Sequence, residues 1–484
     1  MAMVDYTTVL PPETWLAVVE FLAVPPSNPY TRIATSQSDA VILKSSSDIR
    51  TVCSLSRFFL QLADPYRFRE VHFKIDPAKS SIHKLRRIEK LLDLLDRRQE
   101  VKSWIRTFSI GRTPSEGRLA IREDNFDEEY LALEPKIHKA VPELQDLRSL
   151  RCGLVSFPSS LFDGILRLPH LDDLQLEDLQ FIQGTADQTP MQICQNESPL
   201  RRLTIESFGP LSTPVTQALN HLLLKKTLAV LIYWPPLFPD PQTWISLLWV
   251  ISTYIPDYVF TSLREVDIIL PTSNADVQHF VQFGARCPNL VSLTISWNYL
   301  EESLGELENQ LRGACLAEHP FPALQKFAGP LALASIFVEG RPVHSVMSDF
   351  LYEFNWNRSG ATLASQIAAL RPGVPLRVLH LAAQEWKEAD FETIAQHHPD
   401  LEELVYELYG PDLMRWSSRL EDALRKLAKL KSITLKQTSS SDNLTNGVDD
   451  DHYLIVKLRS LCPNLQQANM PWLGIWKRHP QRKD

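Results

Sequence analysis

The sequence predicts an α/β protein in which a helical N-terminal module precedes a long solenoid of parallel strands with outer helices. Three observations support this fold class. A six-residue phrase, leucine–x–x–apolar–x–apolar, recurs along most of the 484 residues. The text between copies is often helical, as in DVQHFVQFGARCPNL and DFETIAQHHPDL. Residues 10–22 form an amphipathic helix with no adjacent partner, which predicts a separate module before the repeats.

The first predicted helix is LPPETWLAVVEFL, residues 10–22. Two prolines and a glutamate suit its first turn, because proline is preorganised there and glutamate meets the positive end of the helix dipole. Its apolar stripe consists of Trp15, Val18, Val19 and Leu22. A helix this short is marginal in water, so it needs a partner helix.

The partner is predicted after an intervening segment. Residues 23–47 carry three prolines and many serines and threonines, which is typical of a loop or insertion. Asp48 then suits an N-cap, and residues 49–63 show a second helical stripe that Pro65 ends. A strand-like run, YRFREVHF, follows at residues 66–73.

These two helices resemble an F-box over residues 8–73, with the insertion at 23–47 as the departure from the family pattern. The matching residues are Leu10, Pro11, Val52, Cys53, Ser56, Arg57, Phe58, Ala63, Asp64 and Pro65. The alternative is a pair of packed helices in a larger all-α domain. The expected boundaries are an F-box at 1–75, a linker helix at 76–100, a leucine-rich-repeat-like solenoid at 101–476 and a basic tail at 477–484.

The linker helix is predicted from SIHKLRRIEKLLDLLDRR, in which Leu85, Ile88, Leu92 and Leu95 share one face. The repeated phrase begins at residues 105, 147, 171, 200, 228, 263, 290, 324, 376, 401, 430 and 465. From 147 onward most intervals are about 24 to 35 residues, and the longest, from 324 to 376, is 52. Seven copies have proline one or two residues before them, which stops a preceding helix.

The phrase resembles leucine-rich repeats, in the irregular form of fungal-type F-box proteins, although their asparagine ladder is missing. Each repeat is expected to supply one strand and one helix, and stacking supplies the core. The alternative is an ordinary α/β domain whose parallel strands happen to look alike.

Composition narrows the function classes. The net charge of −8 argues against a generic nucleic-acid or anionic-membrane binder. Only 16 residues are glycine, and no GxGxxG, GxxxxGK or GxSxG motif is present. Six dispersed cysteines indicate a reducing compartment. No secretory signal is evident at the N-terminus, and the most apolar stretch, residues 244–255, is too short to span a bilayer. We expect a cytoplasmic or nuclear protein.

Candidate catalytic groups are few. HExxH is absent, and paired carboxylates fall on repeated strands and turns. The adjacent His397 and His398 lie at an expected helix end, where the dipole explains them better than a shared metal does. We therefore expect a chain that is not an enzyme and carries no cofactor or metal.

The F-box resemblance implies a substrate-recognition adaptor of an SCF-type cullin–RING ubiquitin ligase, acting in ubiquitin-dependent degradation. Its expected partners are the ligase adaptor subunit, cullin through that subunit, and an unknown protein substrate, with no nucleic acid and no membrane. The expected docking residues are Leu10, Pro11, Trp15, Val19, Leu22, Ile49, Val52, Cys53, Arg57 and Phe58. The alternative is a non-ligase scaffold that uses the solenoid for protein–protein interaction.

The substrate is expected on the concave side of the strands. In the phrase, the apolar residues point inward and the intervening ones point outward. The candidate substrate-binding residues are Asp173, Glu177, Arg202, Glu206, Trp234, Glu265, Asp267, Trp297, Glu403 and Glu407. Acidic residues dominate, so this face is predicted to prefer a basic or mixed peptide with an aromatic anchor. The alternative is that these charges only keep the strand surface hydrated.

Overall fold

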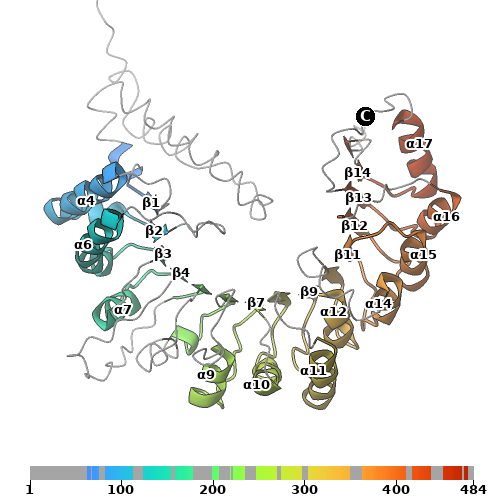
Figure 1. Ribbon diagram of the computed structural model, residues 1–484, viewed down its shortest axis with the longest axis horizontal. Coiled ribbons are helices and arrows are strands. Elements are labelled where there is room, and N and C mark those ends of the chain that lie inside the picture. The colour runs from blue at the N-terminus through green and yellow to red at the C-terminus, as the bar shows by residue number, and fades with distance from the viewer. Residues whose placement is uncertain are drawn as a thin grey trace, which may run out of the picture. The chain divides into compact units, whose positions relative to one another are not determined.

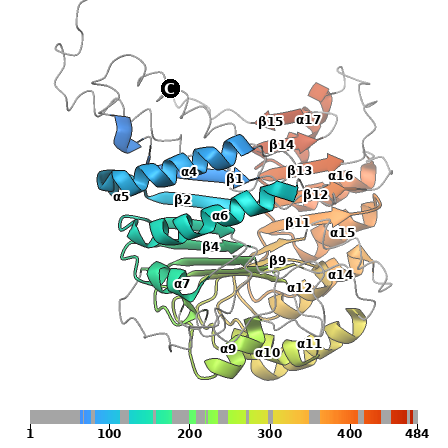
Figure 2. The same cartoon turned by 60° about the vertical axis from the view of Figure 1, so that its left-hand side comes forward.

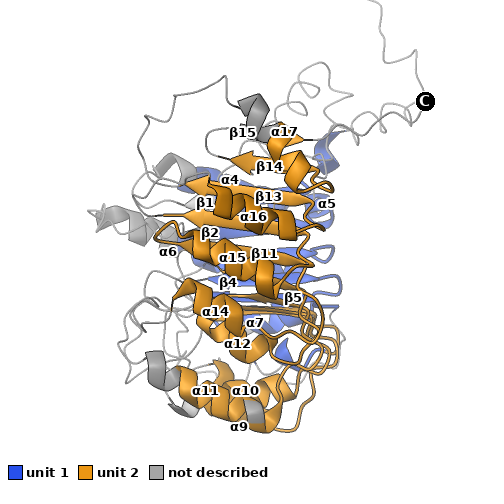
Figure 3. Cartoon of the chain, turned by 90° about the vertical axis from the view of Figure 1, so that its right-hand side faces the viewer, with its two compact units in different colours: residues 1–225 blue, residues 226–484 orange. Residues whose placement is uncertain are grey.

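The structure is a computed structural model of the chain. It describes residues 63–66, 68–75, 82–112, 124–153, 158–177, 199–206, 219, 222–234, 247–269, 274–296, 304–348, 362–409, 417–437, 451–470 and 474–477. The chain divides into two compact units, Met1–Lys225 and Lys226–Asp484 (Figure 3). The expected helix at 10–22, the segment 23–47 and residues 48–62 of the second expected helix lie outside the described residues.

Unit 1 contains a parallel sheet whose strands follow one another in sequence order. The strands are β1 (Glu70–Ile75), β2 (Thr107–Arg112), β3 (Ser149–Gly153), β4 (Asp173–Glu177) and β5 (Arg202–Glu206). The helices are α4 (Ile82–Arg97), α5 (Gln99–Trp104), α6 (Asp124–Ala140), the 3-10 turn η3 (Val141–Glu143) and α7 (Ser159–Leu166).

The helices of unit 1 pack by apolar stripes and by charge. The four residues expected on one face of the linker helix, Leu85, Ile88, Leu92 and Leu95, are at most 2% exposed in α4. Helices α4 and α6 lie side by side (Figure 2), and Lys136 of α6 donates to Glu89 and Asp93 of α4 at 3.0 Å each.

Unit 2 repeats the same plan. Its strands are β6 (Val230–Trp234), β7 (Glu265–Ile269), β8 (Ser292–Ser296), β9 (Lys326–Ala328), β10 (Ser345–Met347), β11 (Val378–Ala383), β12 (Glu403–Leu408), β13 (Ser432–Gln437), β14 (Gln467–Met470) and β15 (Gly474–Lys477). Strands β6 to β14 are parallel and paired in sequence order, and β15 joins β14 antiparallel.

The helices of unit 2 lie along one side of these strands (Figure 1). They are α9 (Leu247–Tyr254), α10 (Asn274–Ala285), α11 (Leu304–Glu318), α12 (Leu331–Val338), α14 (Leu363–Ala369), α15 (Glu388–His397), α16 (Ser418–Lys426) and α17 (Asp451–Leu461). The predicted architecture of parallel strands with helices on one side is therefore confirmed for the described residues. Among those residues, no helix is long and apolar enough to cross a membrane.

Each copy of the repeated phrase coincides with a strand that starts two residues after the first residue of the phrase. That first residue is at most 2% exposed in all the copies, from Ile105 to Leu465. The strand alternation then buries the second apolar position, because successive side chains point to opposite faces. Each copy of the phrase therefore marks one strand and the buried side chains by which that strand contributes to the core.

The structure adds three strands that the phrase does not mark, namely β1, β10 and the antiparallel β15. The run 66–73, expected to close the N-terminal module, overlaps β1, which pairs in parallel with β2. Helix α4 is therefore the connection between two strands of the sheet, although the sequence predicts a linker. Strand β10 fills the 52-residue interval between two copies of the phrase, because it pairs with β9 on one side and β11 on the other.

A backbone ladder ties the repeats together at the start of each strand. The carbonyl before one strand accepts two N–H groups from the chain entering the next strand. In unit 1, Arg148 O accepts from Asp172 N at 2.8 Å and Asp173 N at 3.0 Å; in unit 2, Arg377 O accepts from Glu402 N and Glu403 N at 2.8 and 2.9 Å. These bonds satisfy buried backbone groups in a protein that lacks a regular asparagine ladder.

Candidate functional site

Each unit presents one face of its strands away from its helices, which we call the open face. On β7 and β8 the first, third and fifth residues are partly exposed, whereas the second and fourth are buried against the helices. The open face therefore consists of side chains at odd strand positions. This is the set of positions from which the sequence predicts substrate binding.

The open face of unit 1 holds a network of charged and polar groups on neighbouring strands. Arg151 Nε of β3 lies 2.5 Å from Glu177 Oε1 of β4. Gln175 Nε2 donates to Glu177 Oε1 at 2.8 Å and to Glu206 Oε1 of β5 at 3.1 Å. Glu177 and Glu206 are opposite each other in the strand register, so one amide group connects two facing carboxylates.

Glu177 occupies a different environment from the one expected for a surface binding residue. Its side chain is only 4% exposed, whereas that of its partner Arg151 is 41% exposed. Gly153, which lies opposite Glu177 in the register of β3, contributes no side chain to this part of the face. The carboxylate of Glu177 is thus placed to orient Arg151 and Gln175, and the exposed chemistry of this network is that of Arg151 and Glu206.

Two other candidates in unit 1 are also register partners. Asp173 of β4 is opposite Arg202 of β5, and both are partly exposed. Ser149 Oγ of β3 donates to Asp173 Oδ2 at 3.3 Å. The candidates of unit 1 therefore meet on two adjacent strands.

In unit 2, an aromatic residue and an acid meet on β6 and β7. Trp234 is 41% exposed, and its Nε1 donates to Asp267 Oδ1 at 3.2 Å. Burial raises the pKa of Asp267 to about 6; the Trp234 hydrogen bond opposes this shift, and the negative charge of Glu265 adds to it. Asp267 therefore gains its charge close to neutral pH, beside an exposed indole ring.

A second group in unit 2 gathers on β11, β12 and β13. His380 Nε2 donates to Glu403 Oε1 at 3.1 Å, and this bond holds the pKa of Glu403 below its ordinary value. Glu407 accepts from Lys436 Nζ and, at 2.7 Å, from Tyr409 Oη. Burial alone would raise the pKa of Glu407, but these hydrogen bonds outweigh it and the pKa is lowered.

The candidates thus form separate groups within each unit. Along the sheet of unit 2, β7 and β12 are five strand intervals apart, or roughly 24 Å at the usual strand spacing. Trp297 and the ten expected docking residues of the F-box lie outside the described residues. Within each unit the structure therefore brings together pairs and triads, and in unit 2 the described candidates on β6 and β7 lie apart from those on β12.

Sequence reasoning omitted several residues that contact these groups, among them Arg151, His380 and Tyr409. Arg151 and His380 occupy the third strand position, which is the same position in the phrase as Gln175 and Asp267. Reading that position in every copy would have found both. Tyr409 follows the end of β12, outside the phrase, so only the structure shows its bond to Glu407.

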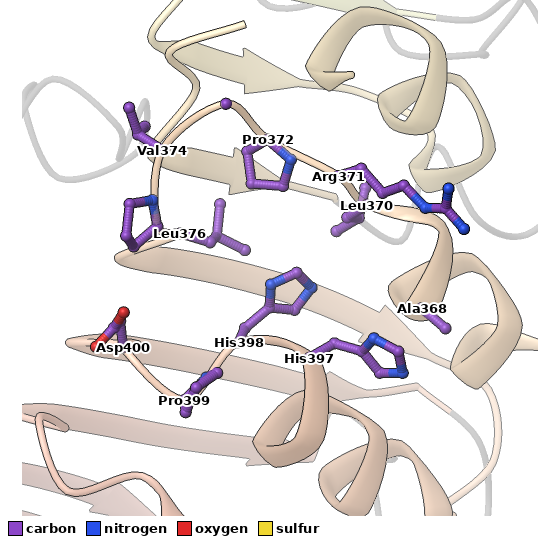
Figure 4. Close-up of a pocket in the computed structure, with 12 residues that line it drawn as sticks. Ala368, Leu370, Arg371, Pro372, Val374, Leu376, His397, His398, Pro399 and Asp400 are labelled. Atoms are coloured by element: carbon purple, nitrogen blue, oxygen red, sulfur yellow. The ribbon is translucent and has the colours of Figure 1, made fainter. Parts of the chain in front are cut away.

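The paired histidines border an open cavity of about 540 Å³ at one end of the strands of unit 2 (Figure 4). His397 ends α15 and is exposed, whereas His398 is 4% exposed and contacts Ile367 O through Nε2 at 3.3 Å. Burial lowers the pKa of His398, so its ring is neutral at pH 7. The ring of His398 links one repeat to the preceding one.

The described cysteines are packing groups. Cys152, Cys287, Cys315 and Cys462 are buried, and burial raises the pKa of each thiol, to about 11 for Cys462 and about 12 for Cys315. These thiols are therefore protonated at pH 7 and are not activated nucleophiles. Within the described ranges, no cluster of three His, Cys, Asp or Glu side chains is placed to hold a metal ion.

Comparison with known proteins adds little to this geometry. No protein-family model matches the chain, and no curated protein sequence matches it significantly. One similar solved structure is the leucine-rich-repeat ectodomain of the plant membrane receptor kinase GASSHO1/SCHENGEN3 from Arabidopsis thaliana, in complex with CASPARIAN STRIP INTEGRITY FACTOR 2. The match has 13% identity and a TM-score of 0.25, and it covers 62% of this chain and 34% of the ectodomain, about a third of its length. The fold class therefore rests on the strand order and register of the chain itself.

Proposed function

We propose that the chain is a protein-interaction solenoid whose open face binds a protein partner. The observation that carries this proposal is the set of oriented carboxylates on the open face. Glu206, Asp267 and Glu403 are each hydrogen-bonded by a neighbouring side chain and remain partly exposed. Repeat proteins of this kind use such an extended surface for binding.

The charge of the open face favours a basic segment as the ligand. On β7, Asp267 lies near the charge of Glu265 and is hydrogen-bonded by Trp234. On β11 to β13, the carboxylates of Glu403 and Glu407 are hydrogen-bonded by His380 and Lys436. Trp234 is among the few large apolar side chains of the described chain that are exposed, and it is adjacent to Asp267. An aromatic contact beside a carboxylate suits a lysine or arginine side chain, which has an apolar stem and a cationic end.

The finer proposal is that the chain is the substrate-recognition adaptor of an SCF-type ubiquitin ligase. Its support is the F-box resemblance of residues 8–73, of which 8–62 lie outside the described residues. The chain would perform no chemistry and need no cofactor. It would act in the cytoplasm or nucleus, without nucleic acid or membrane, by holding a substrate lysine near the conjugating enzyme.

Affinity purification of a docking variant tests the ligase role. A Pro11→Ala, Val52→Asp double variant is expected to lose the adaptor subunit and cullin while it retains partners of the solenoid. A Pro12→Ala, Thr51→Asp variant changes neighbouring residues outside the expected docking set and is the matched control. Recovery of cullin with the double variant at wild-type levels would contradict the docking assignment.

The non-ligase scaffold is the second candidate, because the described strands that form the open face lie within residues 70–477. If wild-type protein recovers the adaptor subunit without cullin, or neither subunit, the scaffold role is favoured over the ligase role.

A charge-neutralising variant tests the open face independently of the ligase role. Glu206→Gln, Asp267→Asn and Glu403→Gln remove three carboxylates and retain the side-chain shapes. Glu177 is left intact because it holds Arg151 in place. Partners recovered by proximity labelling should bind the triple variant several-fold more weakly than wild type at about 0.05 M salt. At high salt, where charges are screened, this difference in affinity should become smaller.

The control for this variant removes the same charge from the helix side of unit 2. Glu318→Gln, Glu392→Gln and Asp422→Asn alter exposed residues of α11, α15 and α16. This control should bind as wild type does. Equal loss in both triple variants would show that net charge, and not the open face, governs binding.

A further inference from the structure

A cavity of about 420 Å³ lies on the helix side of unit 2, away from the open face, between the ends of α11 and α12. Arg312, Cys315, His319, Ile336, Glu339 and Arg341 are among the residues that line it. Its volume is within the range of small-molecule sites. Two guanidinium groups in one small cavity raise the question of what they bind.

Arg341 is a buried cation without a carboxylate partner in the described part of the chain. It is 8% exposed, and its Nε donates to Pro320 O at 2.9 Å. Its Nη1 donates to Ile336 O at 2.9 Å and Glu339 O at 3.4 Å, which places the charge at the C-terminal end of α12. The helix dipole compensates part of this charge, but Nη2 donates no hydrogen bond to any of the described residues.

Arg312 brings the second guanidinium group to the same helix. Its Nη2 donates to Ser335 Oγ of α12 and to Glu308 Oε1 of its own helix, each at 3.1 Å. Ser335 and Ile336 are consecutive, so the two guanidinium groups contact α12 at adjacent residues. Within the described ranges, Arg312 Nη1 and Nε donate no hydrogen bond, and the side chain is 41% exposed.

Two acids, Glu308 and Glu339, lie near the two arginines of this cavity. Glu308 neutralises part of the charge of Arg312. Glu339 lines the cavity, but it is exposed to solvent and forms no ion pair with either arginine. Glu339 acts on Arg341 through its charge alone, which opposes the lowering of the Arg341 pKa that burial causes.

The backbone at the edge of the cavity is held in an uncommon conformation. His319 and Phe321 have φ values of 46° and 56°, the left-handed region that residues other than glycine seldom adopt. They flank Pro320, whose carbonyl accepts from Arg341 Nε. Phe321 is fully buried beside Phe280, with ring centroids 5.5 Å apart, so packing maintains this strained turn.

We infer that this cavity binds a small phosphorylated molecule, with Arg341 and Arg312 holding the phosphate group and Ile336 contacting the apolar part of the ligand. Guanidinium groups match phosphate oxygens through paired, charge-assisted hydrogen bonds. A phosphate monoester offers three acceptor oxygens and up to two negative charges, enough for both arginines. The size of the cavity favours a small molecule over a peptide segment. The inference does not depend on the function of the open face.

Phenyl phosphate is a suitable probe, because it combines a phosphate group with a small apolar ring. Isothermal titration calorimetry of the full chain should show saturable binding, and the melting temperature should rise with probe concentration. Arg312→Gln should raise the dissociation constant of phenyl phosphate at least about tenfold, since it removes one charged donor group. Phenol should show no comparable binding, and benzoate should bind more weakly than phenyl phosphate.

Arg286→Gln is the matched control. Arg286 also donates to backbone carbonyls, with Nη1 2.6 Å from Ile255 O and 2.7 Å from Pro256 O, but it is not among the residues that line the cavity. Its substitution should lower stability without changing the dissociation constant of phenyl phosphate. The inference fails if wild type does not bind phenyl phosphate saturably, if Arg312→Gln binds it equally well, or if phenol or benzoate binds as tightly.

Discussion

At the scale of single residues, burial decides the behaviour of the acids of this protein. Asp390 at the start of α15 is 1% exposed; Tyr406 Oη donates to its Oδ2 at 3.0 Å, while Oδ1 has no partner within the described part of the chain. Trp386 Nε1 is also buried without a hydrogen bond there. Burial raises the pKa of Asp390 to about 6, and the hydrogen bond from Tyr406 and the charge of Lys387 limit the rise.

Asp390→Asn is expected to stabilise the protein at pH 7. The folded-state pKa of Asp390 lies above its ordinary value of 3.8, so its contribution to stability is fully present below pH 3.8 and is lost as pH rises through about 6. The shift of about two units corresponds to roughly 3 kcal/mol at most. Melting temperatures from pH 4 to 7 should fall less in the variant than in wild type, and exposed Asp422→Asn should change little. A variant that melts below wild type at pH 7 would contradict this account.

At the scale of the elements, two glycines show what the repeat requires of its backbone. Gly329 follows β9 with φ of +147°, donates to Met347 O of β10 at 2.9 Å, and would place a Cβ atom 2.7 Å from Ile295 O of β8. Gly313 lies within α11, and a Cβ atom there would meet nothing within 4 Å. The first glycine permits close strand packing, and the second only lowers helix stability.

Alanine substitution at these glycines should have opposite effects. Gly329→Ala should lower the free energy of unfolding by about 1–3 kcal/mol, because strain and a backbone contact both oppose the new side chain. Gly313→Ala should raise it by about 0.5–1 kcal/mol through helix propensity. Thermal and denaturant unfolding of both variants and of wild type measures the two changes in the free energy of unfolding. Equal effects of the two substitutions would mean that neither local environment controls the outcome.

At the scale of the whole molecule, stacking supplies the stability that no single repeat has. Strand β10 is short, yet it is the only connection in register between β9 and β11 among the described strands. Val346 at its centre is fully buried. A defect at this strand should therefore spread first to its immediate neighbours.

Val346→Asp places an unpaired charge in the core and should lower the free energy of unfolding by about 3 kcal/mol or more. Hydrogen exchange should accelerate most in β9, β10 and β11 and least in β6 and β14, because each repeat contacts only its neighbours. Val374→Asp, at a position that is 37% exposed, is the control and should leave exchange unchanged. Uniform acceleration throughout unit 2 would show that the unit unfolds as one block.

The same repeat logic explains which elements can be predicted from the sequence. The leucine phrase marks strands from β2 to β14 because a strand that faces helices needs apolar residues at alternate positions. Strand β10 does not match the phrase because Ser348 occupies its last apolar position. Ser348 is 6% exposed, and its N–H donates to His380 O at 2.8 Å. Strand β1 escapes it because the F-box resemblance assigns its residues to another module.

What the sequence by itself determined is the alternation of buried and exposed positions, and with it the parallel strands, the outer helices and the acidic character of the open face. Tertiary structure alone decided which charges meet. Arg151 reaches Glu177 across two strands, and Arg341 of one repeat closes on Pro320 of the preceding connection. The physical reason is that side-chain alternation is a local property of the chain, whereas ion pairs and cavities depend on strand register and helix placement, which bring distant residues to within a few ångströms.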